Sequence, residues 1–132
     1  MDEPDIRLAG LSIWVRGWDR EDWLRVRAEF DAGNAWVSAQ GPILRGADLA
    51  RFHEGVTAVD AGLADSATLA SAEPNLLVSL IRQGSLGHFE MVVDITPDHT
   101  AQSHRFHVDI DQSYLVALLR QCRAVLARKP AG

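Results

Sequence analysis

The sequence predicts a single α+β domain over residues 1–132, with one mainly antiparallel sheet of six or seven strands and two helices packed on it. Several segments alternate apolar and polar residues, as half-buried strands do. Only two segments, 46–65 and 111–129, show the three- and four-residue spacing of amphipathic helices. Two helices are too few to cross over between most of the strands, so neighbouring strands are expected to run antiparallel. Repeats, low-complexity tracts and linkers are absent from the sequence, which indicates one domain.

Composition and charge argue against several classes of function. Hydrophobic residues make up 47% and charged residues 23% of the chain, the usual balance of a soluble globular protein. The net charge of −5 and the lack of a basic run argue against nucleic acid as a partner. We expect no signal peptide, because the first residues are acidic, and no membrane span, because no apolar stretch approaches about 20 residues. The lone cysteine, Cys122, cannot form an intrachain disulfide, so we expect a reducing cytoplasm.

The clearest strand pattern is a hairpin near the N-terminus. Residues 22–30 and 35–40 both alternate, and residues 31–34 (DAGN) have turn chemistry. Closing the hairpin with Phe30 opposite Ala35 pairs apolar with apolar side chains on one face and polar with polar on the other.

The remaining elements follow from the same periodicities. Strands are expected over 6–17, 67–72 and 75–83, and helices near 47–62 and 112–127. The predicted core is Leu24, Val26, Phe30, Val37, Leu49, Phe52, Val56, Leu76, Val78, Leu80, Phe89, Met91, Val93, Phe106, Val108, Leu115, Leu118 and Leu119.

A second hairpin is predicted over residues 87–109, which hold four of the five histidines. Residues 97–100 (PDHT) form a turn sequence, and pairing Thr96 with Ala101 around it sets the register. One face of the hairpin is then apolar, and the other carries histidines opposite carboxylates.

The polar face of this hairpin has two interpretations. His88, Glu90, His107 and Asp109 are residue types that bind metals, on adjacent strands. They are also the residues of cross-strand charge pairs on a solvated sheet face, each worth roughly 0.2–1 kcal/mol. We favour the second interpretation, because flat sheet faces lack the concavity of ligand sites. No bound metal is expected there.

Catalytic residues are not evident in the sequence. A nucleophile elbow, a P-loop, a dinucleotide fingerprint and an HExxH motif are all missing. Cys122 lies on the apolar stripe of the last helix, so we interpret it as a small hydrophobic residue rather than a nucleophile. No catalytic residue and no cofactor are predicted.

Tryptophans gather in the first 36 residues. Trp23 and Trp36 fall on the polar face of the first hairpin together with Arg25 and Arg27, and tryptophan and arginine dominate interface hot spots. The interpretation that the sequence favours is that the rings cover the sheet margin or pack under the N-terminal strand. If the rings are exposed instead, Trp23, Arg25, Arg27 and Trp36 are the candidate partner-binding residues.

Four short motifs carry a family resemblance: DREDWLRV (19–26), the helix with Leu49 and Phe52, ASAEPNLLVSL (70–80) and HRFHVDIDQSYL (104–115). With these motifs the chain resembles the small bacterial WapI-type immunity proteins and related uncharacterised domains. The resemblance implies a non-enzymatic protein that binds and neutralises a cognate toxin domain, and it implies no catalytic residues.

Two functions are therefore carried forward. The first is a binding protein of the immunity type, whose partner is a toxin domain or a second copy of the chain. An edge strand of the N-terminal hairpin could join two copies by strand addition. The alternative is a small-molecule-binding or hydrolytic domain with a pocket between sheet and helices. A closed core favours the first function, and a deep pocket with convergent polar groups favours the alternative.

Overall fold

The computed structural model describes residues 2–71 and 73–130. Across these residues the chain forms eight strands in two four-stranded sheets, in which all paired strands run antiparallel. The first sheet contains β1 (Ile6–Leu8), β2 (Leu11–Trp18), β3 (Trp23–Asp31) and β4 (Trp36–Arg45) in chain order. The second sheet contains β5 (Ser66–Ala70), β6 (Leu76–Gln83), β7 (His88–Ile95) and β8 (Arg105–Asp111) in chain order. The helices are α1 (Gly46–Asp60) and α2 (Ser113–Leu126).

The α+β class and the antiparallel pairing are confirmed, whereas the prediction of one sheet with six or seven strands is wrong. The additional strand arises because the single strand expected over 6–17 is a hairpin, β1–β2, with its turn at Ala9 and Gly10. Ala9 adopts a positive φ of 51°. A side chain at Gly10 would meet the Asp31 carbonyl oxygen at 2.5 Å, so only glycine fits this turn. The strand expected over 67–72 is β5, and residue 72 itself lies outside the described residues.

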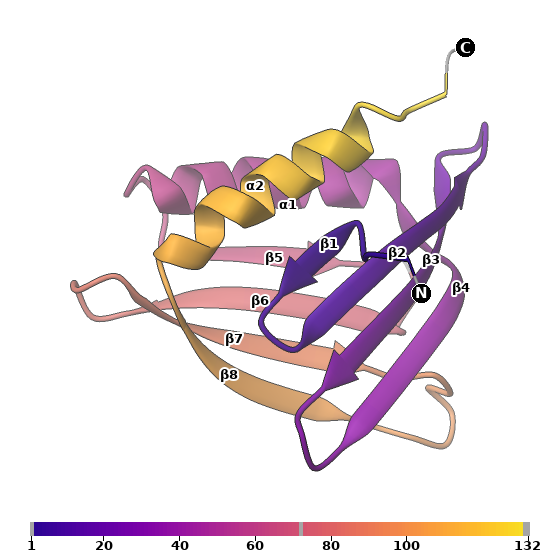
Figure 1. The fold of residues 1–132 in the computed structure, drawn as a ribbon, viewed down its shortest axis with the longest axis horizontal. Helices are drawn as coiled ribbons and strands as arrows, with labels where there is room; N and C mark the ends of the chain where they lie inside the picture. The colour runs from indigo at the N-terminus through magenta and orange to yellow at the C-terminus, as the bar shows by residue number, and fades with distance from the viewer. Residues whose placement is uncertain (1, 72, 131–132) are drawn as a thin grey trace.

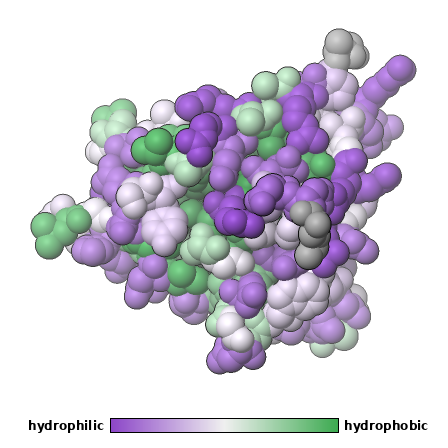
Figure 2. All heavy atoms as spheres, in the orientation of Figure 1, coloured by the Kyte–Doolittle hydropathy of each residue, from purple (hydrophilic) through white to green (hydrophobic). Residues whose placement is uncertain are grey.

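The two sheets face each other, and the helices lie along one side of the pair (Figure 1). Strands β3 and β4 pack over β7, and the rings of Phe30 and Phe106 stack between the sheets with centroids 4.5 Å apart. At the other edges of the sheets, α2 packs against β1, α1 packs against β5, and the helices pack against each other. The helix pair therefore covers one side of the space between the sheets. The side seen in Figure 2 is mostly polar, with apolar residues in separate areas.

Both predicted hairpin registers are wrong by two residues. Phe30 pairs with Val37 rather than Ala35, because the loop spans residues 32–35, closed by the Ala32 N–H donating to the Ala35 carbonyl. In the second hairpin, the loop spans residues 96–103, since the Ile95 N–H donates to the His104 carbonyl. The predicted pairing of Thr96 with Ala101 therefore does not occur. A shift of two residues keeps every side chain on its predicted face.

The helices agree with their predicted positions, and the start of α1 is anchored by the β2–β3 turn. The Asp22 carboxylate accepts hydrogen bonds from the Ala47 N–H at 2.9 Å and from the Trp18 Nε1–H at 2.9 Å. Asp22 has a φ of 70°, a conformation that aspartate tolerates better than most residues. A carboxylate at this position satisfies a free N–H group and complements the helix dipole. Inside the helix, Gly55 permits close packing on β5, because a side chain there would meet the Ala67 Cβ at 3.1 Å.

The predicted core is confirmed with two exceptions. All of the predicted core residues are buried except Phe106 and Val108, which are partly buried on β8 at the edge of the second sheet. The buried cluster is continuous through both sheets and both helices. Hydrophobic burial on this scale is the main stabilising term of a domain of this size.

Candidate partner-binding surface

The outer face of the first sheet gathers large aromatic and basic side chains. Along β3 the residues alternate, so that Leu24, Val26, Ala28 and Phe30 point into the core while Arg25, Arg27 and Glu29 point outward. The cross-strand pairs extend this outer face onto the neighbouring strands. Its members are Ser12 and Trp14 on β2, Arg25, Arg27 and Glu29 on β3, and Trp36, Ser38 and Gln40 on β4.

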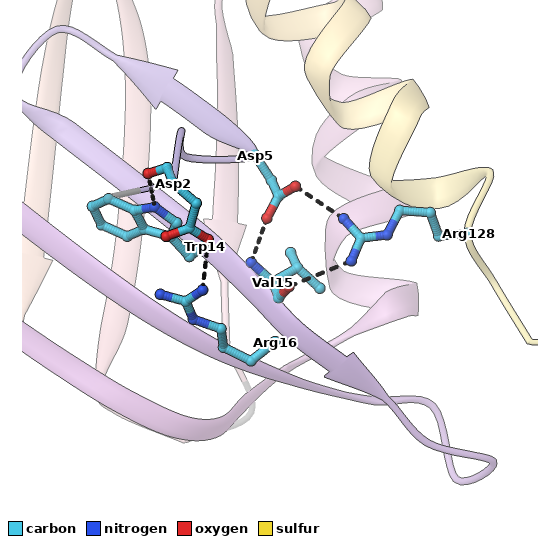
Figure 3. Close-up of polar contacts among 6 residues, drawn as sticks. All are labelled: Asp2, Asp5, Trp14, Val15, Arg16 and Arg128. Carbon is cyan, nitrogen blue, oxygen red and sulfur yellow. Dashed lines mark hydrogen bonds and ion pairs between the residues drawn. The ribbon is translucent and has the colours of Figure 1, made fainter.

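The N-terminal segment covers one part of this face (Figure 3). The indole Nε1–H of Trp14 donates to the Asp2 carbonyl oxygen at 3.0 Å, and the Asp2 carboxylate pairs with Arg16 at 2.8 Å. The hydrogen bond from Arg16 lowers the pKa of Asp2 below its ordinary value. Trp14 is consequently buried, although it lies on the outer side of the sheet.

A second group of contacts ties the same segment to the end of α2 (Figure 3). The Asp5 carboxylate accepts from the Val15 N–H at 2.6 Å and pairs with Arg128 at 2.9 Å. Arg128 also donates to the Val15 carbonyl at 3.4 Å. These bonds hold the N-terminal segment in place, so it forms a fixed wall of the outer face.

Beside this wall lies a hollow of about 500 Å³. Its lining includes Trp14, Arg27 and Trp36 from three adjacent strands and the N-terminal residues Asp2 and Glu3. The Arg27 guanidinium lies 5.9 Å from the Trp14 ring centroid, and its Nη2 lies 3.3 Å from the Glu29 carboxylate. Within the described residues, the buried Arg27 Nε–H has no hydrogen-bond acceptor.

Trp36 is the most accessible aromatic group of the face. Its side chain is 54% exposed at the start of β4, next to the β3–β4 loop. Contacts with Trp14 and Glu29 hold the Arg27 guanidinium in position. The exposed Trp36 ring and this guanidinium line the same hollow. Such a combination suits binding of a protein surface.

Trp23 and Arg25 lie at a separate position on the same sheet. They line a smaller hollow of about 130 Å³ with Trp18 and Pro42. The Arg45 guanidinium stacks over the Trp23 ring at 4.5 Å, which is a cation–π geometry. Trp23 is half-buried and Arg25 is exposed.

The four sequence-predicted residues therefore do not form one compact cluster. Arg27 and Trp36 share the larger hollow, and Trp23 and Arg25 share the smaller one. The sequence favoured an interpretation in which the rings of both Trp23 and Trp36 are sheltered. That interpretation is wrong for Trp36, which is exposed. Sequence reasoning missed the contribution of the N-terminal segment, since nothing in the residue pattern indicates that Asp2 contacts Trp14.

The outer face of the second sheet carries charges that are largely paired. Asp94 lies opposite Arg105 and accepts two of its hydrogen bonds, at 2.6 and 3.0 Å. These bonds raise the pKa of Arg105 above its ordinary value. In the observed register, Asp109 lies directly opposite Glu90. His107 is therefore diagonal to Glu90, and its Nδ1 lies 3.6 Å from the Glu90 carboxylate.

The metal interpretation of these histidines gains no support from this geometry. The predicted pairs of His88 with Asp109 and of Glu90 with His107 are replaced by His88 with Asp111 and Glu90 with Asp109. Over residues 2–71 and 73–130, no group of three or more His, Cys, Asp or Glu side chains is arranged to hold a metal ion.

The interior between the sheets and helices is filled with apolar side chains. Cys122 on α2 is fully buried there, and burial raises the pKa of its thiol to about 12. A thiol in this state is protonated at neutral pH and is a poor nucleophile.

In the described part of the chain, no helix is both long and apolar enough to cross a membrane.

Comparison with known proteins matches the chain to a protein family. The sequence model of the immunity protein WapI-like family matches residues 5–130, nearly the whole chain. No curated protein matches the chain significantly. No solved structure matches it significantly either.

Proposed function

The chain belongs to the immunity protein WapI-like family, and we propose that it binds a cognate toxin domain and neutralises it. The observation that carries the proposal is the family match over residues 5–130, which includes both sheets and both helices. The protein acts by binding, and we propose that it does so in the cytoplasm, where its single buried cysteine is reduced.

The filled interior supports binding over the alternative of a ligand-binding or hydrolytic domain. That alternative needs a pocket between sheet and helices with convergent polar groups. The facing residues of α1 and α2, such as Phe52, Val56 and Leu115, are packed in the continuous apolar core. The hollow of about 290 Å³ where Trp18 lies near the start of α1 and the end of α2 has a mainly apolar lining.

We assign the toxin contact to the outer face of the first sheet. Trp36 and Arg27 line its larger hollow, Trp23 and Arg25 line its smaller one, and the fixed N-terminal segment borders the larger one. Exposed tryptophan is costly for solubility, and a contact surface explains why it is present. Trp14, Trp23 and Arg27 already have contacts within the chain, which lowers the conformational entropy that these side chains lose on binding.

Neutralisation in cells tests this proposal. The proposal predicts that the gene directly upstream encodes a toxin domain, and this domain is the probe, expressed in a bacterial host with and without the chain. Growth should stop with the toxin domain alone and recover with the chain present. Purified chain should also form a stable complex with an inactive variant of the toxin domain.

A failure to restore growth by chain that is folded and abundant contradicts the proposal. An unrelated toxin domain of similar size serves as the control, because protection against both would indicate a general effect on growth rather than specific neutralisation.

A further inference from the structure

The edges of the two sheets are a part of the molecule separate from the outer face of the first sheet. Two four-stranded sheets have four edges, formed by β1, β4, β5 and β8. An uncovered edge offers unpaired N–H and C=O groups and can add a strand from another chain. The four edges differ in how well they are protected.

Three of the edges are covered or interrupted. Strand β1 has three residues and packs against α2, whose Gln121 side chain accepts from the Arg7 N–H at 2.9 Å. Strand β5 packs against α1. Strand β4 contains Pro42, which has no N–H group, next to an irregularity in its pairing with β3. These features are the usual protections of a sheet edge.

Strand β8 lacks these protections along its length. Its seven residues, RFHVDID, include neither proline nor glycine. Its inward-facing Phe106 and Val108 are only partly buried, whereas the inward-facing residues of the neighbouring β7 are fully buried. In Figure 1 this strand forms the outer edge of the second sheet, on the side away from the helices.

The hydrogen-bond pattern determines which residues of β8 face outward. The Ile95 N–H donates to His104, and the Gln112 N–H donates to Gly87, so the even-numbered residues of β8 bond to β7. The N–H and C=O groups of Arg105, His107 and Asp109 therefore point to the free edge. Among the described residues these groups have no hydrogen-bond partner in the rest of the chain.

The sequence of β8 is complementary to itself in the antiparallel direction. With Val108 opposite Val108 of a second copy, His107 lies opposite Asp109, Arg105 opposite Asp111, and Phe106 opposite Ile110. Basic groups thus meet carboxylates on the outer face, and apolar groups meet on the inner face. The same register pairs the odd-numbered residues, whose N–H and C=O groups face the edge.

The register also compensates a like-charge contact within each chain. Asp109 lies directly opposite Glu90, a pairing that is unfavourable on a sheet face. A second copy would place an imidazole on the other side of Asp109. We propose that two copies of this chain associate through antiparallel β8–β8 addition, which joins their second sheets into one continuous sheet.

Oligomeric state in solution tests this proposal, by sedimentation or light scattering over a concentration series. The wild-type mass should rise from 14.5 kDa towards twice that value. His107→Pro removes an outward N–H without breaking a bond to β7, so it should keep its circular dichroism spectrum and stay at 14.5 kDa.

A charge exchange keeps the test decisive if the proline variant does not fold. His107→Asp places two carboxylates opposite each other and should weaken the dimer about tenfold. Adding Asp109→Lys should restore the wild-type affinity, because lysine then faces the new aspartate. In the single Asp109→Lys chain, the lysine also faces Glu90, which keeps the second sheet stable.

Three results overturn the proposal. A wild-type chain that remains monomeric at every concentration excludes self-association through this edge. A dimer that persists in His107→Pro and in His107→Asp uses another surface. A monomeric wild-type chain whose binding of the toxin domain is lost in His107→Pro would assign the edge to the toxin rather than to a second copy.

Discussion

The two sheets have the same inner construction and different outer faces. Leu24 and Val26 in the first sheet are as fully buried as Leu80 and Met91 in the second. The outer face of the first sheet carries tryptophans and arginines around hollows of about 500 and 130 Å³. The outer face of the second sheet has no tryptophan and mixes paired charges, such as Asp94 with Arg105, with apolar side chains, and its hollow of about 310 Å³ is lined in part by this charge pair. The inner faces therefore account for the stability of the fold, and the tryptophans of the first sheet are the reason why we propose its outer face as the partner contact.

The largest effect is expected from removing inner-face side chains, and it should be the same for both sheets. Leu24→Ala and Leu80→Ala should each lower the free energy of unfolding by about 2–5 kcal/mol, because both side chains are completely buried in one core. Denaturant unfolding measures both values. A single cooperative transition is expected in each variant, and separate transitions for the two sheets would show that the core is not shared.

The closed interior predicts a loss of stability at high pH. The Cys122 thiol has an ordinary pKa of 9.0 and a pKa of about 12 in the fold. Between these values the thiol ionises only in the unfolded chain, so its contribution to stability is complete below pH 9.0 and is lost as the pH rises towards about 12. The loss approaches about 1.4 kcal/mol per pH unit.

Cys122→Ala removes this titration and should flatten the decline of stability between pH 9 and 11 relative to wild type, as followed by urea unfolding at each pH. Parallel declines in the two proteins would mean that the thiol ionises readily in the folded state, and hence that the interior near α2 is open.

A smaller effect is expected where the first sheet anchors α1. Asp22→Ala removes the acceptor for the Ala47 N–H and the Trp18 indole, and should destabilise the fold by about 1–2 kcal/mol. Asp22→Asn is the matched control, since asparagine keeps an acceptor oxygen and also tolerates positive φ, so it should lose less. Thermal unfolding compares the two variants, and equal stability of Asp22→Ala and wild type would contradict the capping role.

No effect is expected from metal ions on the second sheet. Calorimetric titration with zinc or nickel should show no stoichiometric binding, because the charges around His107 form cross-strand pairs rather than a ligand cluster. Stoichiometric sub-micromolar binding that is abolished in His107→Ala would reverse this interpretation and give the second sheet a site of its own.

Much of the fold is predictable from local periodicity. The two helical stripes and the alternation of β3 and β7 were read correctly, and nearly all of the predicted core residues are buried, but the core also includes residues that were not predicted, such as Leu8, Ile13 and Leu69. The registers were not predictable, because alternation has a period of two and is unchanged by the two-residue shift that the loops at 32–35 and 96–103 impose.

The division into two sheets was not predictable for a related reason. A strand buried on its inner face has the same pattern whether the facing layer is a helix or another sheet. The position of Trp36 and Arg27 on one face of the first sheet was predictable from alternation. The wall formed by Asp2 and its contact with Trp14 was not, because it depends on long-range packing that leaves no local signal.

The most direct test of the assignment of the toxin contact is the affinity of Trp36→Ala for the cognate toxin domain, measured by calorimetry beside Tyr114→Ala. Tyr114 is the matched control, an aromatic residue on α2 that is 41% exposed, away from the outer face of the first sheet. We expect Trp36→Ala to weaken binding by about 2 kcal/mol or more, roughly 30-fold, with an unchanged thermal unfolding temperature, and Tyr114→Ala to bind like wild type. Wild-type affinity in Trp36→Ala, or a loss of folding without a separate binding defect, would contradict the assignment of this face to the toxin.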